Sequence, residues 1–262
     1  MVSAHPDWIV PDWPAPSRVR ALCTSRHGGV SQAPYDSLNL GLHVADNEAA
    51  VHINRQRLAH AVAGRPVFLN QVHGNTCLSL EPGTPNGSEA DACYATAPGM
   101  VCTIMVADCL PVLFAAADGS WVAAAHAGWR GLAGSDGHGV LEETLEQLRS
   151  VAPMDIARAA PEIIAWLGPC IGPQAFEVGG EVRAAFVHAL PAAAGCFQPQ
   201  AGDKWLADLP ALARQRLQAA GVHSIWGNDG STAWCTVSNP SRFFSHRRDR
   251  VSGRLAACIW LE

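Results

Sequence analysis

Short apolar runs, each bounded by Gly, Pro or Asp, recur along the chain and predict many short strands. They are rich in Val, Ile, Leu, Ala and aromatic residues, a composition typical of buried strands. Asp118 and Gly119 separate two of the runs, and this dipeptide is a strong hairpin signal, so we expect the flanking runs to pair antiparallel. The predicted strands are residues 20–24, 66–73, 76–80, 100–107, 111–117, 121–127, 163–168, 223–227 and 255–261.

Helical spacing, with apolar residues three and four positions apart, marks three other segments. Asp46 is predicted to cap a helix over residues 47–63. A second helix is predicted over residues 139–151, and a third over 208–221 with Asp208 as its cap. Strands outnumber helices and hairpins alternate with longer crossings, which favours an α+β domain over a doubly wound fold.

Length and charge bound the class of protein. The 262 residues are 48% hydrophobic, enough for a substantial core, and we expect one domain over residues 1–262 whose proline-rich residues 1–18 form an irregular extension. The net charge of −5 leaves no basic excess for nucleic acid. No apolar run is long enough to span a membrane, and no secretory signal is recognisable. We therefore expect a cytoplasmic monomer with neither nucleic acid nor membrane as a partner.

Nine cysteines include no CxxC pair, which excludes zinc-ribbon and thioredoxin-like spacings. In a reducing compartment most of them are expected to be small buried residues. One cysteine, Cys109, nevertheless ends an apolar run, as His73 and His126 do. Side chains in such positions project from a sheet edge into any cavity that lies there.

Two chemistries are open to these three residues. Two imidazoles and one thiolate form a ligand set for Zn²⁺ with a fourth position open for water, whose pKa such zinc lowers to about 7. Alternatively, Cys109 is a nucleophile and His126 its base, with Asp108 or another polar group orienting the histidine. His73 favours the metal, because a dyad has no use for a third ligand. A purely structural role for all three is the remaining interpretation, since their spacing matches no general metal motif.

The 11 histidines bear on copper chemistry. Oxidases with several coppers need many histidines, commonly in His-x-His pairs, and no two histidines here are two positions apart. The pattern therefore disfavours a trinuclear copper cluster, and copper ranks behind zinc as a cofactor candidate.

Arginines are the candidates for binding an anion, because a guanidinium group fits phosphate or carboxylate. Arg26 precedes a Gly-Gly turn, Arg130 lies just beyond His126, and Arg247 begins an arginine-rich segment. The chain has neither a P-loop nor a complete dinucleotide-binding fingerprint, which disfavours nucleoside triphosphatases and nicotinamide enzymes.

Asn39 and Cys170 lie in tight turns bounded by Gly or Pro. Such positions more often serve backbone geometry than catalysis. Asn39 is still a candidate for hydrogen bonding to a sugar or base, and Cys170 for lining the pocket.

Five ordered segments resemble the YfiH-type laccase-domain family: SLNLGLHVAD, NQVHG, VADCLPVLFAAADGSWVAAAHAGWRGLAG, LGPCIGPQAFEVGGEV and RFFSHRRDRVSGRLAACIWL. The resemblance runs from Arg20 to the C-terminus. It implies a single α+β domain, a layered α/β/β/α sandwich with mixed sheets, similar to cysteine hydrolases of the cytotoxic-necrotizing-factor type. It also implies that His73, Cys109 and His126 form a zinc site.

The same resemblance implies an enzyme of purine nucleosides, acting by phosphorolysis of adenosine, inosine and methylthioadenosine and by hydrolytic deamination of adenosine. Hydrolysis of an amide or ester in peptidoglycan precursors and copper-dependent polyphenol oxidation are the alternatives. Residues 135–138 and His246 depart from the family pattern and are expected to affect the pocket mouth. Besides the metal ligands, the residues assigned roles are Asp108, Arg26 and Arg247 in catalysis, and Asn39, Arg130 and Cys170 in substrate contacts.

Overall fold

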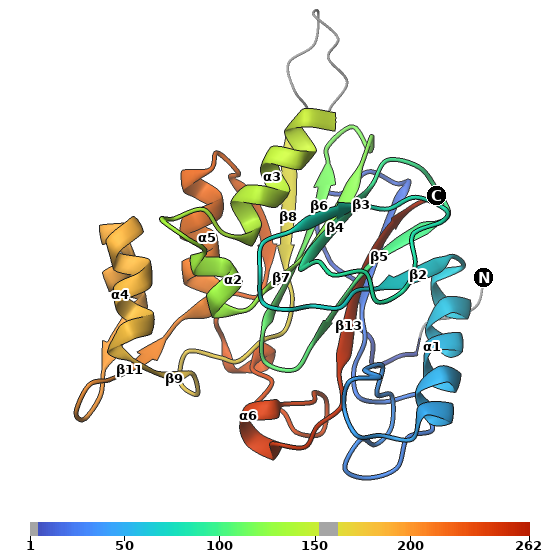
Figure 1. The fold of residues 1–262 in the computed structure, drawn as a ribbon, viewed down its shortest axis with the longest axis horizontal. Helices are drawn as coiled ribbons and strands as arrows, with labels where there is room; N and C mark the ends of the chain where they lie inside the picture. The colour runs from blue at the N-terminus through green and yellow to red at the C-terminus, as the bar shows by residue number, and fades with distance from the viewer. Residues whose placement is uncertain (1–4, 152–161) are drawn as a thin grey trace, which may run out of the picture.

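Two β-sheets lie face to face at the centre of the molecule, and helices cover their outer faces (Figure 1). The computed structural model describes residues 5–151 and 162–262. Buried apolar residues form three layers: one between the sheets, one under α1 (Glu48–Val62), and one under α3 (Val140–Val151) and α5 (Leu209–Ala219). The expected α+β sandwich with mixed sheets is confirmed.

The four-stranded sheet has continuous apolar runs because both of its faces are buried. In the last strand, Leu255, Ala257 and Ile259 belong to the layer between the sheets, whereas Ala256 and Cys258 pack in the layer under α1. In spatial order its strands are β1 (Val19–Cys23), β13 (Leu255–Leu261), β5 (Met100–Val106) and β2 (Arg65–Phe68), with β2 and β5 parallel and the other pairs antiparallel.

The six-stranded sheet contains the predicted hairpin. Strands β6 and β7 are antiparallel, with Leu113 opposite Ala124 and Pro111 opposite His126, so that prediction is confirmed. The sheet is mixed, because the β12–β8 and β3–β4 pairs are parallel. In spatial order its strands are β12 (Ser224–Gly227), β8 (Ile163–Leu167), β6 (Leu110–Ala116), β7 (Val122–Ala127), β4 (Ala92–Ala95) and β3 (Cys77–Ser79).

A small third sheet was not predicted from the sequence. It lies beside α4 (Gly180–Ala189), another element without a sequence signal (Figure 1). Its strands are β10 (Phe197–Pro199), β11 (Lys204–Ala207) and β9 (Glu177–Gly179). The remaining short elements are α2 (Trp129–Ala133), η1 (Pro191–Cys196), η2 (Thr232–Trp234) and α6 (His246–Asp249).

Two local predictions were wrong. Asn47, not Asp46, caps α1: its side chain accepts a hydrogen bond from the backbone of Ala50, while Asp46 bonds to Ser31 instead. The strand predicted over residues 66–73 ends at Phe68, because the backbone N–H of Asn70 donates to the loop at Ser88 rather than to a strand of the sheet.

The segment before β1 makes few regular contacts. Within residues 5–18, one isolated β-bridge joins Ile9 to Cys23, and Trp8 packs into the layer under α1. Among the helices of the described residues, none has the length and apolar character needed to cross a membrane.

Candidate functional site

Three metal-ligating side chains meet where the chain crosses between the two large sheets. Cys109 ends the connection between β5 of one sheet and β6 of the other, and His126 is the penultimate residue of β7. His73 comes from the loop that follows β2. The Cys109 Sγ lies 3.7 Å from His73 Nε2, and the ligand atoms of all three residues lie within 4.8 Å of one another. The sequence therefore predicted this convergence, although His73 stands on a loop and not at a strand end.

A single buried carboxylate holds two of these ligands. Asp91 Oδ1 accepts hydrogen bonds from the His73 backbone N–H at 2.9 Å and from His126 Nδ1 at 2.8 Å. Its Oδ2 accepts from the backbone N–H groups of Val72 and Gly74. Because His126 Nδ1 is used in this way, Nε2 is the nitrogen left for a ligand. Asp91 had no signal in the sequence, since its partners are distant and the strand it precedes was not predicted.

The loop carrying His73 is fixed in an unusual conformation. His73 has a φ of 63°, a left-handed conformation that is uncommon outside glycine. Gln71 clamps the loop to β5 through two hydrogen bonds of 2.8 Å with the backbone of Met105. The ligand is therefore held by its loop before any metal binds.

The charges of the site are strongly coupled. Burial alone would raise the pKa of Cys109, but the neighbouring His126 and His73 lower it to about 6. Burial would lower the pKa of His126, but the Cys109 thiolate and the hydrogen bond to Asp91 raise it to about 9. Desolvation likewise opposes ionisation of Asp91, yet its hydrogen bonds hold its pKa below the ordinary value. At neutral pH the metal-free site therefore holds a thiolate beside an imidazolium.

Glycines allow α2 to approach the three ligands closely. A Cβ on Gly128 would lie 2.7 Å from His73 Cδ2 and 3.1 Å from Cys109 Sγ. A Cβ on Gly131 would lie 2.7 Å from the carbonyl oxygen of Gly74. Because these glycines have no side chain, the backbone of residues 128–131 packs directly against one side of the three-ligand group.

The donor set fits a metal ion. Two imidazole nitrogens and a thiolate of lowered pKa are ligands that Zn²⁺ favours, and a buried carboxylate that hydrogen-bonds a ligating histidine is a common feature of zinc sites. A second group within the described residues, His138 with Glu143 and Glu146, offers mainly carboxylates and lies at the start of α3.

Two cavities meet at Cys109, and they share Ala107, Cys109 and His246. The larger, of about 420 Å³, is the polar cavity, and the smaller, of about 160 Å³, is the apolar cavity. The other residues of the polar cavity are His43, Leu69, Asn70, Gln71, His73, Met105, Val106, His126 and Arg254. The other residues of the apolar cavity are Asp108, Trp129, Ile171, Phe176, Leu209, Arg247 and Arg250.

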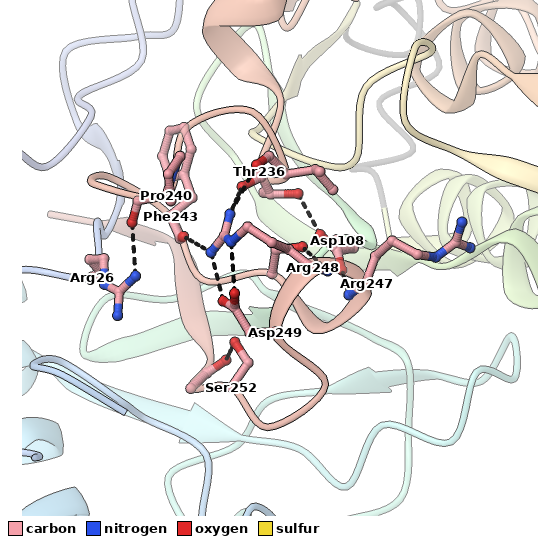
Figure 2. A network of polar contacts seen from close by, with 12 residues as sticks. Arg26, Asp108, Thr236, Pro240, Phe243, Arg247, Arg248, Asp249 and Ser252 are labelled. Atoms are coloured by element: carbon pink, nitrogen blue, oxygen red, sulfur yellow. Dashed lines mark hydrogen bonds and ion pairs between the residues drawn. The ribbon is translucent and has the colours of Figure 1, made fainter. Parts of the chain in front are cut away.

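Asp108 and Arg247 both line the apolar cavity. Asp108 Oδ1 accepts from the hydroxyl of Thr236 at 2.5 Å, and Oδ2 accepts from the Arg247 backbone N–H at 2.6 Å (Figure 2). Asp108 therefore fastens α6 beside the cavity. The Arg247 guanidinium lies over the ring of Phe176, 5.6 Å from its centroid, and donates to the carbonyl of Glu177.

Arg26 and Arg130 line neither cavity. The guanidinium of Arg26 donates to Asp36 and to the carbonyl oxygen of Pro240. Figure 2 shows it on the opposite side of the polar network from Arg247, so the two arginines do not face a common ligand. Arg130 lies over the ring of Trp129 at the surface.

Asn39 and Cys170 are buried and line neither cavity. The Asn39 amide bonds to Gly41, Asp46 and the backbone N–H of Arg254, which uses both its donor and acceptor atoms within the protein. The Cys170 thiol lies 3.4 Å from Asn228 Nδ2, and burial raises its pKa well above the ordinary value. Cys170 forms an isolated β-bridge with Cys235, so the tight turn expected there is not found.

The segment 135–138 also lies apart from the ligands. Gly137 lines a separate cavity with Arg216 and Ala220, and neither Asp136 nor His138 lines the polar or the apolar cavity. His246, the other departure from the family pattern, is common to both cavities.

The protein is thus an α+β sandwich with a candidate metal site of one cysteine and two histidines, which lies where the chain crosses between the two large sheets. A family model described as "Multi-copper polyphenol oxidoreductase laccase" matches residues 20–262. The chain belongs to this family, in agreement with the resemblance of its sequence segments.

Similar proteins share nearly the whole chain. The "Purine nucleoside phosphorylase YfiH" of Escherichia coli (strain K12) is 52% identical over 256 residues, covering 97% of this chain and 98% of the relative. A purine nucleoside phosphorylase of Pseudomonas aeruginosa is 51% identical with the same coverage. The crystal structure of a Neisseria meningitidis protein superposes with a TM-score of 0.88 at 43% identity, covering 98% of this chain and 99% of that one. The fold is thus shared with solved members of the family.

Proposed function

We propose that the protein is a zinc-dependent purine nucleoside phosphorylase that cleaves adenosine, inosine and methylthioadenosine with phosphate, and that it also deaminates adenosine hydrolytically. The observation that carries the proposal is the position of the His73, Cys109 and His126 group at the junction of the polar and apolar cavities. Support for the substrate class comes from the relatives named purine nucleoside phosphorylase.

The two cavities suit the two halves of a nucleoside. Trp129, Ile171 and Phe176 give the apolar cavity the aromatic and aliphatic walls that a flat purine ring packs against. The polar cavity suits the ribose hydroxyls and an attacking phosphate. A nucleoside spanning both has its glycosidic bond beside Cys109. Deamination instead requires C6 of the purine to lie beside the three metal ligands, so the two reactions correspond to two orientations of the nucleoside.

In phosphorolysis, a phosphate oxygen forms a bond to C1′ while the glycosidic bond breaks and its electron pair passes to the purine, which takes up a proton. Both oxygens of Asp108 already accept hydrogen bonds, so we assign Asp108 to holding α6 rather than to proton transfer. We assign to His246, the imidazole common to both cavities, the donation of the proton that the departing purine takes up.

His73, Cys109 and His126 would hold the metal, and Asp91 would orient two of them. Zinc bound there would supply Lewis acidity, the property by which zinc sites make water nucleophilic near neutral pH. Neither phosphorolysis nor deamination transfers electrons, so an ion without redox chemistry suffices. This favours zinc over the copper of the family's description.

A cysteine hydrolase acting on an amide or ester, such as a peptidoglycan precursor, is the second candidate. It is favoured by the series Cys109, His126 and Asp91, which has the order of a nucleophile, its base and an orienting carboxylate. The lowered pKa of Cys109, about 6, suits a nucleophile as well as a metal ligand.

A nucleoside panel assayed with and without phosphate tests the proposal. Zinc-loaded protein should convert adenosine to inosine and ammonia without phosphate, and to adenine and ribose 1-phosphate only when phosphate is present. Chromatography of the products, with ribose 1-phosphate measured separately, follows both reactions. If zinc-loaded protein consumes no nucleoside, the proposal fails. Turnover of an amide or ester by metal-free protein, blocked by alkylation of Cys109, would then support the hydrolase.

A further inference from the structure

Arg254 enters the polar cavity without an acidic partner. Its Nη1 donates to the carbonyl oxygens of Ser252 at 2.8 Å and Gly253 at 3.1 Å. Its Nε and Nη2 form no hydrogen bond, and no carboxylate lies within ion-pair distance, among the residues that the structure describes. Arg254 is half-buried, and its Nε and Nη2 are not among the buried atoms that lack a partner, so these two donors are open to the cavity and available to a ligand.

Both the backbone and the side-chain stem of Arg254 are held in place by residues 39–41. The backbone N–H of Arg254 donates to Asn39 Oδ1, and its carbonyl accepts from Leu40. The side-chain stem lies against Gly41, where a Cβ would stand 2.8 Å from Arg254 Cγ and 3.3 Å from His43 Cε1. The SLNLGLH segment therefore positions Arg254 beside His43, which gives that conspicuous sequence a role apart from direct substrate contact.

The composition of the polar cavity points to an anion. Besides the metal ligands His73 and His126, its lining contains Arg254 and two further histidines, His43 and His246, and it includes no Asp or Glu among the described residues. Its one source of negative charge is the Cys109 thiolate, which a metal ion would neutralise. Desolvation lowers the pKa of Arg254, but an arginine keeps its charge at neutral pH.

We propose that Arg254, with His43 beside it, forms the subsite for inorganic phosphate in the polar cavity. A phosphate there would accept hydrogen bonds from the free Nε and Nη2 of Arg254 and lie in the same cavity as the three metal ligands. The inference rests on the proposed function in taking this phosphate as the co-substrate of phosphorolysis.

The other arginines near the site are less suited to this task. Arg247 lies over Phe176 in the apolar cavity, Arg250 is exposed at its edge, and Arg26 is bound within the protein. The sequence-based choice of Arg26 and Arg247 for the phosphate is therefore replaced by Arg254.

Titration calorimetry of zinc-loaded protein with inorganic phosphate alone tests the subsite. Arg254→Met keeps the apolar stem and removes the charge, and should raise the dissociation constant at least about tenfold, as expected for loss of a charge-assisted contact. Gly41→Ala keeps the charge but crowds Arg254 Cγ, and should also weaken binding. Arg20→Met is the matched control, because Arg20 pairs with Glu262 at the surface and lines neither cavity.

The outcomes separate the subsite from the proposed function. Phosphate binding that depends on Arg254 in a protein that cleaves no nucleoside would uphold the subsite and refute the function. Phosphorolysis with an unchanged KM for phosphate in Arg254→Met would overturn the subsite alone. If wild-type protein binds AMP more tightly than adenosine through Arg254 but does not bind inorganic phosphate, the co-substrate assignment is wrong. Gly41→Ala decides the question if Arg254→Met does not fold.

Discussion

Replacing Cys109 by alanine is expected to remove the bound metal and to lower nucleoside turnover by about a thousandfold or more, equivalent to at least about 4 kcal/mol of transition-state stabilisation. Cys109 supplies the single sulfur ligand and stands where the two cavities meet. His73 and His126 alone would bind the ion weakly, because the negatively charged sulfur ligand, which lies 3.7 Å from His73 Nε2 in the wild type, would be missing. Metal content by mass spectrometry and steady-state assays with adenosine and inosine measure both losses.

Cys170→Ala is the matched control. Cys170, unlike the half-buried Cys109, is fully buried and lines neither cavity, so its loss should affect stability while leaving metal content and most of the activity. Equal losses of activity in the two variants, with folding and metal content intact, would show that Cys109 has no special role.

Asp91→Asn is expected to weaken zinc binding by about 10- to 100-fold, a typical effect of losing the hydrogen-bond partner of a ligating histidine. The carboxylate accepts four hydrogen bonds, from His126 and from the backbone of residues 72–74. An asparagine has one acceptor oxygen and turns an NH₂ group toward N–H donors, so the positions of both His73 and His126 are loosened. Competition with a chromophoric chelator measures the affinity.

A readout that a merely structural role would not change is the Nδ1 proton of His126. In the zinc-loaded wild type, the hydrogen bond to Asp91 holds this proton, so NMR of the ¹⁵N-labelled imidazole should show that it exchanges faster with water in Asp91→Asn. Glu89→Gln is the control, because Glu89 lies in the same segment and is exposed. Unchanged zinc affinity and unchanged exchange of the His126 Nδ1 proton in a folded Asp91→Asn protein would refute the positioning role of Asp91.

The parts of the fold that could be predicted are those in which burial, or a turn of characteristic sequence, leaves a recognisable pattern of residues. β5 and β13 are buried on both faces and therefore appear as continuous apolar runs, and the β6–β7 hairpin carries its own Asp-Gly turn. α4 and the third sheet gave little signal. α4 begins at Gly180 without a side-chain cap, and β9–β11 are short and partly exposed.

The site could be predicted as far as its ligands. His73, Cys109 and His126 each adjoin an apolar run and belong to recognisable segments. Asp91 could not be predicted, because its hydrogen bonds reach residues 18 and 35 positions away. The role of Arg254 likewise depends on the packing of its stem against Gly41. These two residues lie far apart in the sequence, so no local pattern shows the contact.

The most direct test of the account is an anomalous-scattering map at the zinc edge, from crystals of protein never exposed to a chelator. We predict a single strong peak within about 2.5 Å of Cys109 Sγ, His73 Nε2 and His126 Nε2. A map without a peak at these three atoms, in a protein that still turns over its substrate, would contradict a metal site at the crossing of the two sheets.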